Sequence, residues 1–249
     1  MGSRLLYYAA KISEMPKIGI TKFERIMSEK GMTLKQKRNW VRTTFSVKHQ
    51  YENLINGMEL VDINTVVTGD ITYYFTENQR YYVFTLKDQY SKRILGLYGS
   101  TNMYAQCALE TFYQLLKVRK KENLQNMIHH TDAGSQYLSK AYKAELQKYG
   151  IRISIAKNCL ENGSAEQLNG VVKNDYLGNY EIRNVKHLNR ILQKIKKLIN
   201  EEKPVALLGY RTPIEFEEYI KGLSKKDRPK VVLFDFEAAN KTEGGFSKA

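Results

Sequence analysis

Three acidic residues of this 249-residue chain stand where carboxylates can do chemistry. Asp70 lies inside the β-branched and aromatic run Val66–Phe75, where an aspartate is disfavoured and needs a reason to be present. Asp132 follows directly on a short apolar stretch, and Glu166 comes after the next such stretch. Taken singly, a strand-end aspartate is more often a turn or cap residue, and a helical glutamate is usually solvated. Only the three together indicate a shared site.

A cluster of carboxylates makes physical sense chiefly as a cation site. Without a cation the carboxylates repel one another, and the pKa of at least one is raised. Hard divalent ions such as Mg²⁺ take oxygen ligands and keep positions open for phosphate. Two such ions about 3.5–4 Å apart can activate an attacking hydroxyl and stabilise the leaving oxygen in an in-line displacement.

The elements that must position these side chains follow an α/β pattern. Three strands at hairpin-like spacing are expected over Val66–Phe75, Arg80–Lys87 and Lys92–Tyr98. A helix over about Tyr104–Lys120, a strand Asn126–His130, a helix Lys140–Lys148, a strand Ile151–Ala156 and a helix from Asn162 follow. This order predicts an RNase H-like core, a mixed five-stranded sheet with flanking helices. The strand of Asp70 and the strand before Asp132 are then central neighbours, and the helix of Glu166 crosses the same sheet edge.

Helical patterns flank this core on both sides. The first forty residues read as helical, with Phe23, Ile26 and Met27 at helical spacing and a stop at Gly31. A second helix is expected from Thr33 through Trp40. After the core, we expect helices over Val185–Asn200 and from Thr212-Pro213 to Tyr219, and a last strand over Lys230–Phe236.

The charge balance indicates a polyanion partner. Lys and Arg number 40 against 26 Asp and Glu, a formal net charge of +14, and the pI is about 9.5. Such a balance is typical of proteins that neutralise phosphates, which favours nucleic acid over a generally basic surface.

The sequence has no apolar run long enough for a transmembrane helix, so no membrane association is expected. The run Lys117 to Lys121, with Arg119, is interpreted as a solvated helix end.

Four blocks of sequence, in order, resemble the integrase-like core of bacterial insertion-sequence transposases. The blocks are Asp70-Ile-Thr-Tyr, Asp88-Gln-Tyr-Ser-Lys-Arg-Ile-Leu-Gly, His130-Thr-Asp-Ala-Gly-Ser-Gln-Tyr and Glu161-Asn-Gly-Ser-Ala-Glu-Gln-Leu-Asn-Gly-Val-Val-Lys-Asn-Asp-Tyr-Leu. The match is to the group whose catalytic subunit is encoded by a second, overlapping reading frame (OrfB-type). It covers roughly residues 17–219, and retroviral integrases are more distant relatives.

The resemblance implies an Asp-Asp-Glu triad formed by Asp70, Asp132 and Glu166, which act as catalytic residues and metal ligands. It implies Mg²⁺ (or Mn²⁺) dependence, with two ions, hydrolytic nicking at element ends and strand transfer by the freed 3′-hydroxyl. Lys173 matches a basic position two helical turns after Glu166, from which it contacts the DNA backbone. Further DNA-binding candidates are Asn162, Asn169, Lys35, Lys37 and Arg38, and loop-orienting roles for the two asparagines are equally open.

The chain departs from the family pattern in three places. The stretch between Asp132 and Glu166 is about two residues short near Lys157–Leu160, which shortens an active-site loop. Lys203-Pro204-Val205-Ala206 stands where the family usually shows Arg-Pro-His. The N-terminus begins inside what is usually a longer helix-turn-helix region, so full end recognition is expected to need a missing segment or another polypeptide, for which an upstream-frame helix-turn-helix protein is the candidate partner.

The resulting division of the chain has four parts. Residues 1–42 are expected to form a partial helix-turn-helix-like DNA-binding region, 43–62 a linker, 63–222 the catalytic core and 223–249 a C-terminal extension. The expected protein is a homo-oligomeric DNA transposase in the bacterial cytoplasm, associated with the nucleoid. Two alternatives remain open at this point: a nuclease of the same fold that only hydrolyses, and a catalytically silent DNA-binding repressor of transposition.

Overall fold

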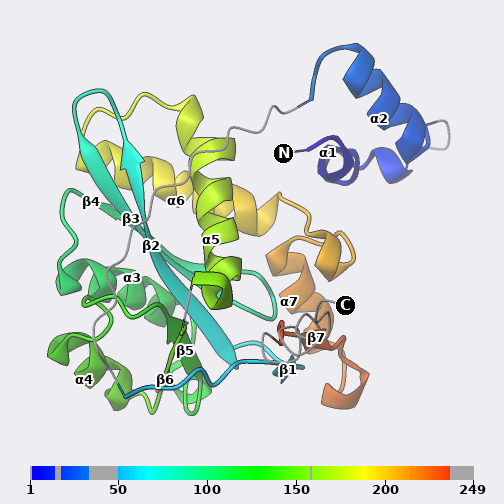
Figure 1. The fold of residues 1–249 in the computed structure, drawn as a ribbon. Helices are drawn as coiled ribbons and strands as arrows, with labels where there is room; N and C mark the ends of the chain where they lie inside the picture. The colour runs from blue at the N-terminus through cyan, green and yellow to red at the C-terminus, as the bar shows by residue number, and fades with distance from the viewer. Residues whose placement is uncertain (1, 15–17, 34–49, 158, 236–249) are drawn as a thin grey trace, which may run out of the picture.

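A computed structural model describes residues 2–14, 18–33, 50–157 and 159–235 of the chain (Figure 1). Two short helices open it, α1 (Ser3–Ala9) and α2 (Ile20–Glu29), and an ion pair between Arg4 and Glu24 joins them. The expected stop is confirmed, since α2 ends just before Gly31, whose φ of 67° suits glycine. The expected second helix from Thr33, with Lys35, Lys37 and Arg38, lies almost entirely outside the described residues.

The central sheet has five strands in the order β4-β3-β2-β5-β6. Strands β2 (Val66–Phe75), β3 (Arg80–Asp88) and β4 (Ile94–Ser100) pair in antiparallel fashion. Strands β5 (Ile128–Thr131) and β6 (Arg152–Ile155) extend the sheet in parallel on the other side of β2. The predicted mixed five-stranded sheet is therefore confirmed, and β2 and β5 are the central neighbours.

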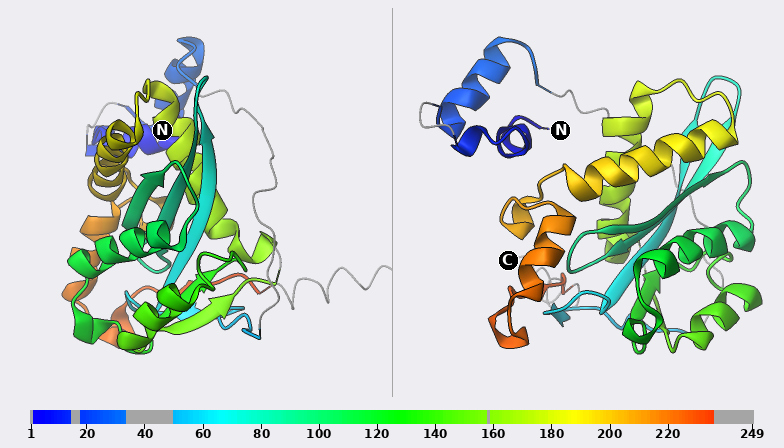
Figure 2. Two further views of the ribbon diagram at one scale, coloured as in Figure 1. Left: turned by 90° about the vertical axis from the view of Figure 1, so that its left-hand side faces the viewer. Right: turned by 180° about the vertical axis from the view of Figure 1, so that it is seen from behind.

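Helices cover the sheet on both faces. Helices α3 (Ala105–Val118) and α4 (Lys140–Lys148) enclose one apolar cluster against Val67, Phe84 and Leu86, which point to one side of their strands. Helices α5 (Gly163–Gly170) and α6 (Val185–Glu201) enclose another against Val83 and Leu97. In Figure 1, α5 crosses in front of the strands, and α6 comes to the front in the view from behind (Figure 2).

A smaller unit at one end of the sheet joins the two flanks of the core. Strand β1 (Glu59–Leu60), from the predicted linker, pairs with β7 (Val231–Val232), from the predicted C-terminal extension. Helix α7 (Pro213–Lys221) begins with a capping box at Thr212, and its apolar side chains pack against those of β1 and β7. The strand expected over Lys230–Phe236 is thus reduced to two residues. No helix within the described ranges is long and apolar enough to cross a membrane.

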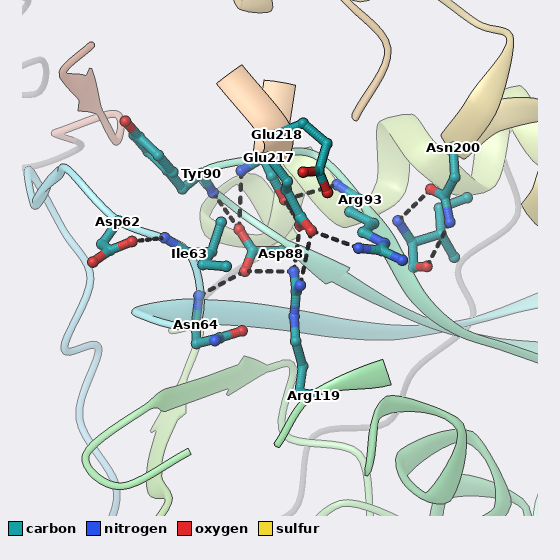
Figure 3. A network of polar contacts seen from close by, with 12 residues as sticks. Asp62, Ile63, Asn64, Asp88, Tyr90, Arg93, Arg119, Asn200, Glu217 and Glu218 are labelled. Atoms are coloured by element: carbon teal, nitrogen blue, oxygen red, sulfur yellow. Dashed lines mark hydrogen bonds and ion pairs between the residues drawn. The ribbon is translucent and has the colours of Figure 1, made fainter. Parts of the chain in front are cut away.

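A buried ion-pair network ties α7 to the core (Figure 3). Glu217 of α7 accepts hydrogen bonds from Arg119 at the end of α3, from Arg93 (2.5 Å) and from the Ser91 hydroxyl (2.7 Å). Burial alone would raise the pKa of Glu217, but the hydrogen bonds and charges of the two arginines hold it below its usual value. The interpretation of Arg119 as part of a solvated helix end is wrong, because its side chain is buried against Glu217.

Candidate active site

The structure brings the three predicted carboxylates to one place from three elements. Asp70 lies in the middle of β2, opposite Thr85 of β3, and is 8% exposed. Asp132 follows directly on β5, the parallel neighbour of β2, and is half-buried. Glu166 is exposed on the first turns of α5, which the Asn169 side chain fastens to Asp70 with a 2.6 Å hydrogen bond.

The electrostatics of the site show that the three carboxylates interact. Burial raises the pKa of Asp70 to about 8, and the charges of Asp132 and Glu166 add to the rise. The pKa of Glu166 is raised as well, by partial burial and then by the charge of Asp132. Within the part of the chain that the structure describes, no three His, Cys, Asp or Glu side chains form a closed metal-binding group. The carboxylates therefore converge within electrostatic reach, without the tighter spacing of an assembled ligand set.

This arrangement agrees with the comparisons to known proteins. Residues 62–158, which include Asp70 and Asp132, match the family described as Integrase core domain. The chain is 28% identical over 172 residues to the transposase for insertion sequence element IS904 of Lactococcus lactis, covering 67% of each chain. The chain therefore has an integrase core and is similar to insertion-sequence transposases.

Two further comparisons extend over more of the chain. A 31 kDa protein of insertion element IS600 from Shigella sonnei is 26% identical over 208 residues, covering 81% of this chain and 75% of its own. The simian T-cell lymphotropic virus intasome, solved in complex with the PP2A regulatory subunit B56 gamma, contains a chain of similar fold. Its TM-score is 0.51 at 16% identity, covering 84% of this chain and 74% of that chain. The chain therefore has the RNase H-like fold of integrase catalytic cores.

Two asparagines hold α5 in place. The Asn162 amide donates to the carbonyl of Gly69 (3.4 Å), and the Asn169 amide donates to Asp70. Both side chains are almost fully buried, and among the described residues their Oδ1 atoms have no hydrogen-bond partner. Their burial favours the positioning role over direct contact with DNA.

Lys173 follows Glu166 on a stretch of π-helix, Val171–Tyr176, that continues α5. Burial lowers the pKa of Lys173, and the charge of Asp70 opposes that change, so its amine lies within electrostatic reach of Asp70. Single π-helical segments are often found at functional sites. The predicted contact of Lys173 with the DNA backbone remains a prediction.

Two of the places where the chain departs from its family have local replacements. In the shortened loop, the Glu161 carboxylate accepts hydrogen bonds from the Asn53 side chain (2.7 Å) and from the backbone of Lys157 (2.8 Å). In the Lys203-Pro204 block, the Lys203 amine lies 3.4 Å from a carboxylate oxygen of Asp175 in the π-helical segment. Each replacement thus supports the segment that carries Glu166 or the segment that follows it.

Lys87 is a site residue that the sequence analysis missed. It lies on β3, is 6% exposed, and donates from Nζ to the carbonyl (2.5 Å) and hydroxyl (2.8 Å) of Ser164 in the first turn of α5. Burial lowers the pKa of Lys87 to about 7. Strand parity is the signal that could have found it, because Lys87 points to the same face as Thr85, the partner of Asp70.

The adjacent histidines in the middle of β5, His129 and His130, have packing roles. The His129 ring bonds the Tyr142 hydroxyl (2.9 Å), and the His130 ring bonds the Ser154 hydroxyl (2.8 Å). Burial lowers the pKa of each histidine to about 4. Of the two rings, that of His129 also lies against Gly69, next to Asp70, so it helps to pack the strand that carries the first carboxylate.

The raised pKa of Asp70 predicts how stability depends on pH when divalent cations are removed by EDTA. The folded-state pKa of about 8 lies above the ordinary value of 3.8, so the folded protein binds more protons than the unfolded chain between these values. Stability should therefore fall as pH rises from about 4 to about 8, since the buried carboxylate must ionise. Thermal unfolding of the wild type and Asp70→Asn measures this. The wild type should lose stability relative to the variant toward pH 8, and parallel curves would refute the prediction.

Proposed function

We propose that the transposase cuts DNA at the ends of its element and joins the freed 3′ ends to target DNA, with Asp70, Asp132 and Glu166 as its catalytic residues. The observation that carries this proposal is that Asp70 on β2 and Glu166 on α5 both have a raised pKa, through burial and then through the charge of Asp132, which follows β5. A fold has little reason to bury Asp70 beside two other acids unless a cation neutralises them.

The residues present fit a divalent cation. All three side chains offer oxygen atoms, which Mg²⁺ and Mn²⁺ prefer, and Glu166 is exposed on α5, where a rotamer change can bring it closer. The buried Oδ1 atom of Asn169, which has no partner among the described residues, adds an oxygen beside Asp70. Two such ions, when bound, activate the attacking oxygen and stabilise the leaving oxygen.

The chain's own residues then orient the reacting phosphate. Asp70 is fixed by its strand and by Asn169, Asp132 by its place at the end of β5, and Glu166 through the contact of Lys87 with Ser164. In the first step a water oxygen bonds to phosphorus, and the bond to the 3′ oxygen breaks. In the second step that 3′ oxygen bonds to a phosphorus of the target strand, and the bond between this phosphorus and the target's own 3′ oxygen breaks. The first step hydrolyses one phosphodiester and the second exchanges one phosphodiester for another, so neither requires a nucleotide cofactor.

The wider setting is part of the same proposal. The core is taken as residues 63–222, flanked by a partial helix-turn-helix-like region (1–42), a linker (43–62) and a C-terminal extension (223–249). We infer that the transposase acts as a homo-oligomer on paired DNA ends, assisted by an upstream-frame helix-turn-helix protein. Its place is the bacterial cytoplasm, at the nucleoid, where its DNA substrate lies.

A strand-transfer assay tests the proposal. The transposase is incubated with Mg²⁺, a labelled duplex that carries the element's terminal sequence, and an unlabelled plasmid. The expected result is a 3′ nick at the element end and labelled strands joined to the plasmid. Cleavage without joining would identify a nuclease instead, and binding without cleavage would identify a repressor of transposition. A reaction with Ca²⁺ in place of Mg²⁺ controls for binding alone.

A further inference from the structure

One face of α6 carries a row of cations. Lys186, Arg190 and Lys194 recur every four residues and are all exposed, while the opposite face of the helix is buried against the sheet. Among the described residues, the ion pairs of α6 are confined to Lys197 and Glu201, 3.8 Å apart near the end of the helix. Within that part of the chain, the row therefore presents three positive charges to solvent without a carboxylate partner.

The stability of α6 does not explain this row. Cations near the start of a helix oppose its dipole, and like charges four residues apart repel each other. Lys186 nevertheless stands in the first turn, which holds no acidic residue, and an acid, Glu201, ends the helix. The helix is stabilised by other means, namely a cap in which the Asn184 side chain accepts from the backbone of His187 (2.8 Å), and its buried apolar face. Helix stability therefore does not account for the three cations, and we look for their role in binding a partner outside the helix.

The row lies apart from the carboxylates. Helix α6 runs along the edge strand β4, where the Asn189 side chain bonds both backbone groups of Gly99 (2.7 and 2.9 Å). Strand β3 separates β4 from β2, which carries Asp70, and β5 with Asp132 lies beyond β2. The view from behind in Figure 2 shows α6, in yellow, crossing in front of the strands. The row therefore lies at the edge of the sheet, two strands from Asp70, where a second DNA segment can lie beside the one whose phosphate is at Asp70.

We propose that Lys186, Arg190 and Lys194 bind the phosphate backbone of the target DNA duplex. The inference rests on the proposed function, in which two DNA segments are needed, the element end that is cut and the target that receives it. The row spans roughly 12 Å of helix axis, against one phosphate per about 3.4 Å of each DNA strand. Lys and Arg are common phosphate contacts, and such contacts carry no sequence information, so the row suits a partner bound through its phosphates rather than through its sequence.

The test neutralises the row in the full-length chain by the changes Lys186→Gln, Arg190→Gln and Lys194→Gln. Binding to a random-sequence duplex is measured across salt concentrations, since each lost phosphate contact lowers the salt slope by about 0.9. The expected slope falls by about 2 to 3, and strand transfer falls at least about 10-fold at 0.1 M salt. Hydrolysis at the element end should stay within about twofold, because it needs no target. The melting temperature should be unchanged or higher.

A matched control removes the same charge elsewhere, by Lys221→Gln, Lys225→Gln and Lys226→Gln. Lys221 and Lys225 are exposed cations that already face the carboxylates of Glu218 and Asp62. Wild-type strand transfer and an unchanged salt slope in the α6 variant would overturn the inference. Equal losses of end hydrolysis and strand transfer would also overturn it, because they would assign the row to the element end. A wild type that binds duplex DNA but never joins it contradicts the proposed function, while the salt slope still decides whether α6 binds DNA.

Discussion

Asp132→Asn should abolish both nicking and strand transfer while DNA binding persists. Asparagine has nearly the same shape as aspartate but cannot supply the charge that a divalent cation needs beside Asp70. Loss of a metal-held transition state costs several kcal/mol, so turnover should fall by about three powers of ten or more. Both steps should fall together, because the same carboxylates serve the hydrolysis and the joining.

The charge of Asp132 also makes a prediction about the folded protein. Asp132 raises the pKa of both Asp70 and Glu166, so its neutralisation relieves repulsion. The variant should be at least as stable as the wild type without divalent cations, and its affinity for DNA should be unchanged or slightly higher. Gel-based cleavage, strand transfer and DNA titration measure these effects. Asp227→Asn, which removes an exposed charge far along the chain, is the control. DNA cleavage by the Asp132→Asn variant at the wild-type level would contradict the assignment of Asp132 to the catalytic triad.

Glu217→Ala should destabilise the fold more than any surface substitution on α7. The change leaves Arg119 buried and Arg93 largely buried, with Asp88 as the nearest remaining acid, 3.7 Å from Arg119. Removal of one partner from a buried ion pair costs about 3–5 kcal/mol. At roughly 2–4 °C per kcal/mol for a chain of this size, the melting temperature should fall by about 6–20 °C.

The adjacent residue on α7 provides the control. Glu218 pairs with Lys221 on the surface, and both side chains are 64% exposed, so Glu218→Ala should cost about 1 kcal/mol at most. Calorimetry or circular dichroism of both variants measures the difference. Similar melting temperatures for the two variants would show that the network does not hold α7 to the core. The loss of stability in Glu217→Ala should affect the active site only indirectly, because Glu217 touches neither Asp70 nor Glu166 in the described contacts.

The catalytic core could be predicted from the sequence because its signals are local. Strand β2 and helix α4 begin and end where their apolar patterns do, at Val66–Phe75 and Lys140–Lys148. The alternation of strands and helices along the chain predicts the strand order. That order puts Asp70 on β2 and Asp132 at the end of its neighbour β5. The pairing of β2 with β5 agrees with this placement, as does the rise in the pKa of Asp70 that the charge of Asp132 contributes.

The remaining features depend on distant contacts that no local pattern carries. Arg119 sits in a lysine-rich run that reads as solvated, and only α7, about a hundred residues later, supplies its partner Glu217. Lys87 ends the predicted strand, where a lysine is usually exposed, but in the structure it lies within β3 and is covered by α5 through its contact with Ser164. The last strand is short because β1, its only partner in the described structure, offers two residues for pairing. Each error reflects a tertiary contact that overrides a local preference.

The most direct test of the central claim is a crystal structure of the transposase with Mn²⁺ and element-end DNA, with the metals located by their anomalous scattering. We expect two Mn²⁺ ions about 3.5–4 Å apart, bound by carboxylate oxygens of Asp70, Asp132 and Glu166, with a DNA phosphate between them. Density for Mn²⁺ at other side chains, or an absence of ions at Asp70 while DNA occupies the site, would contradict the account.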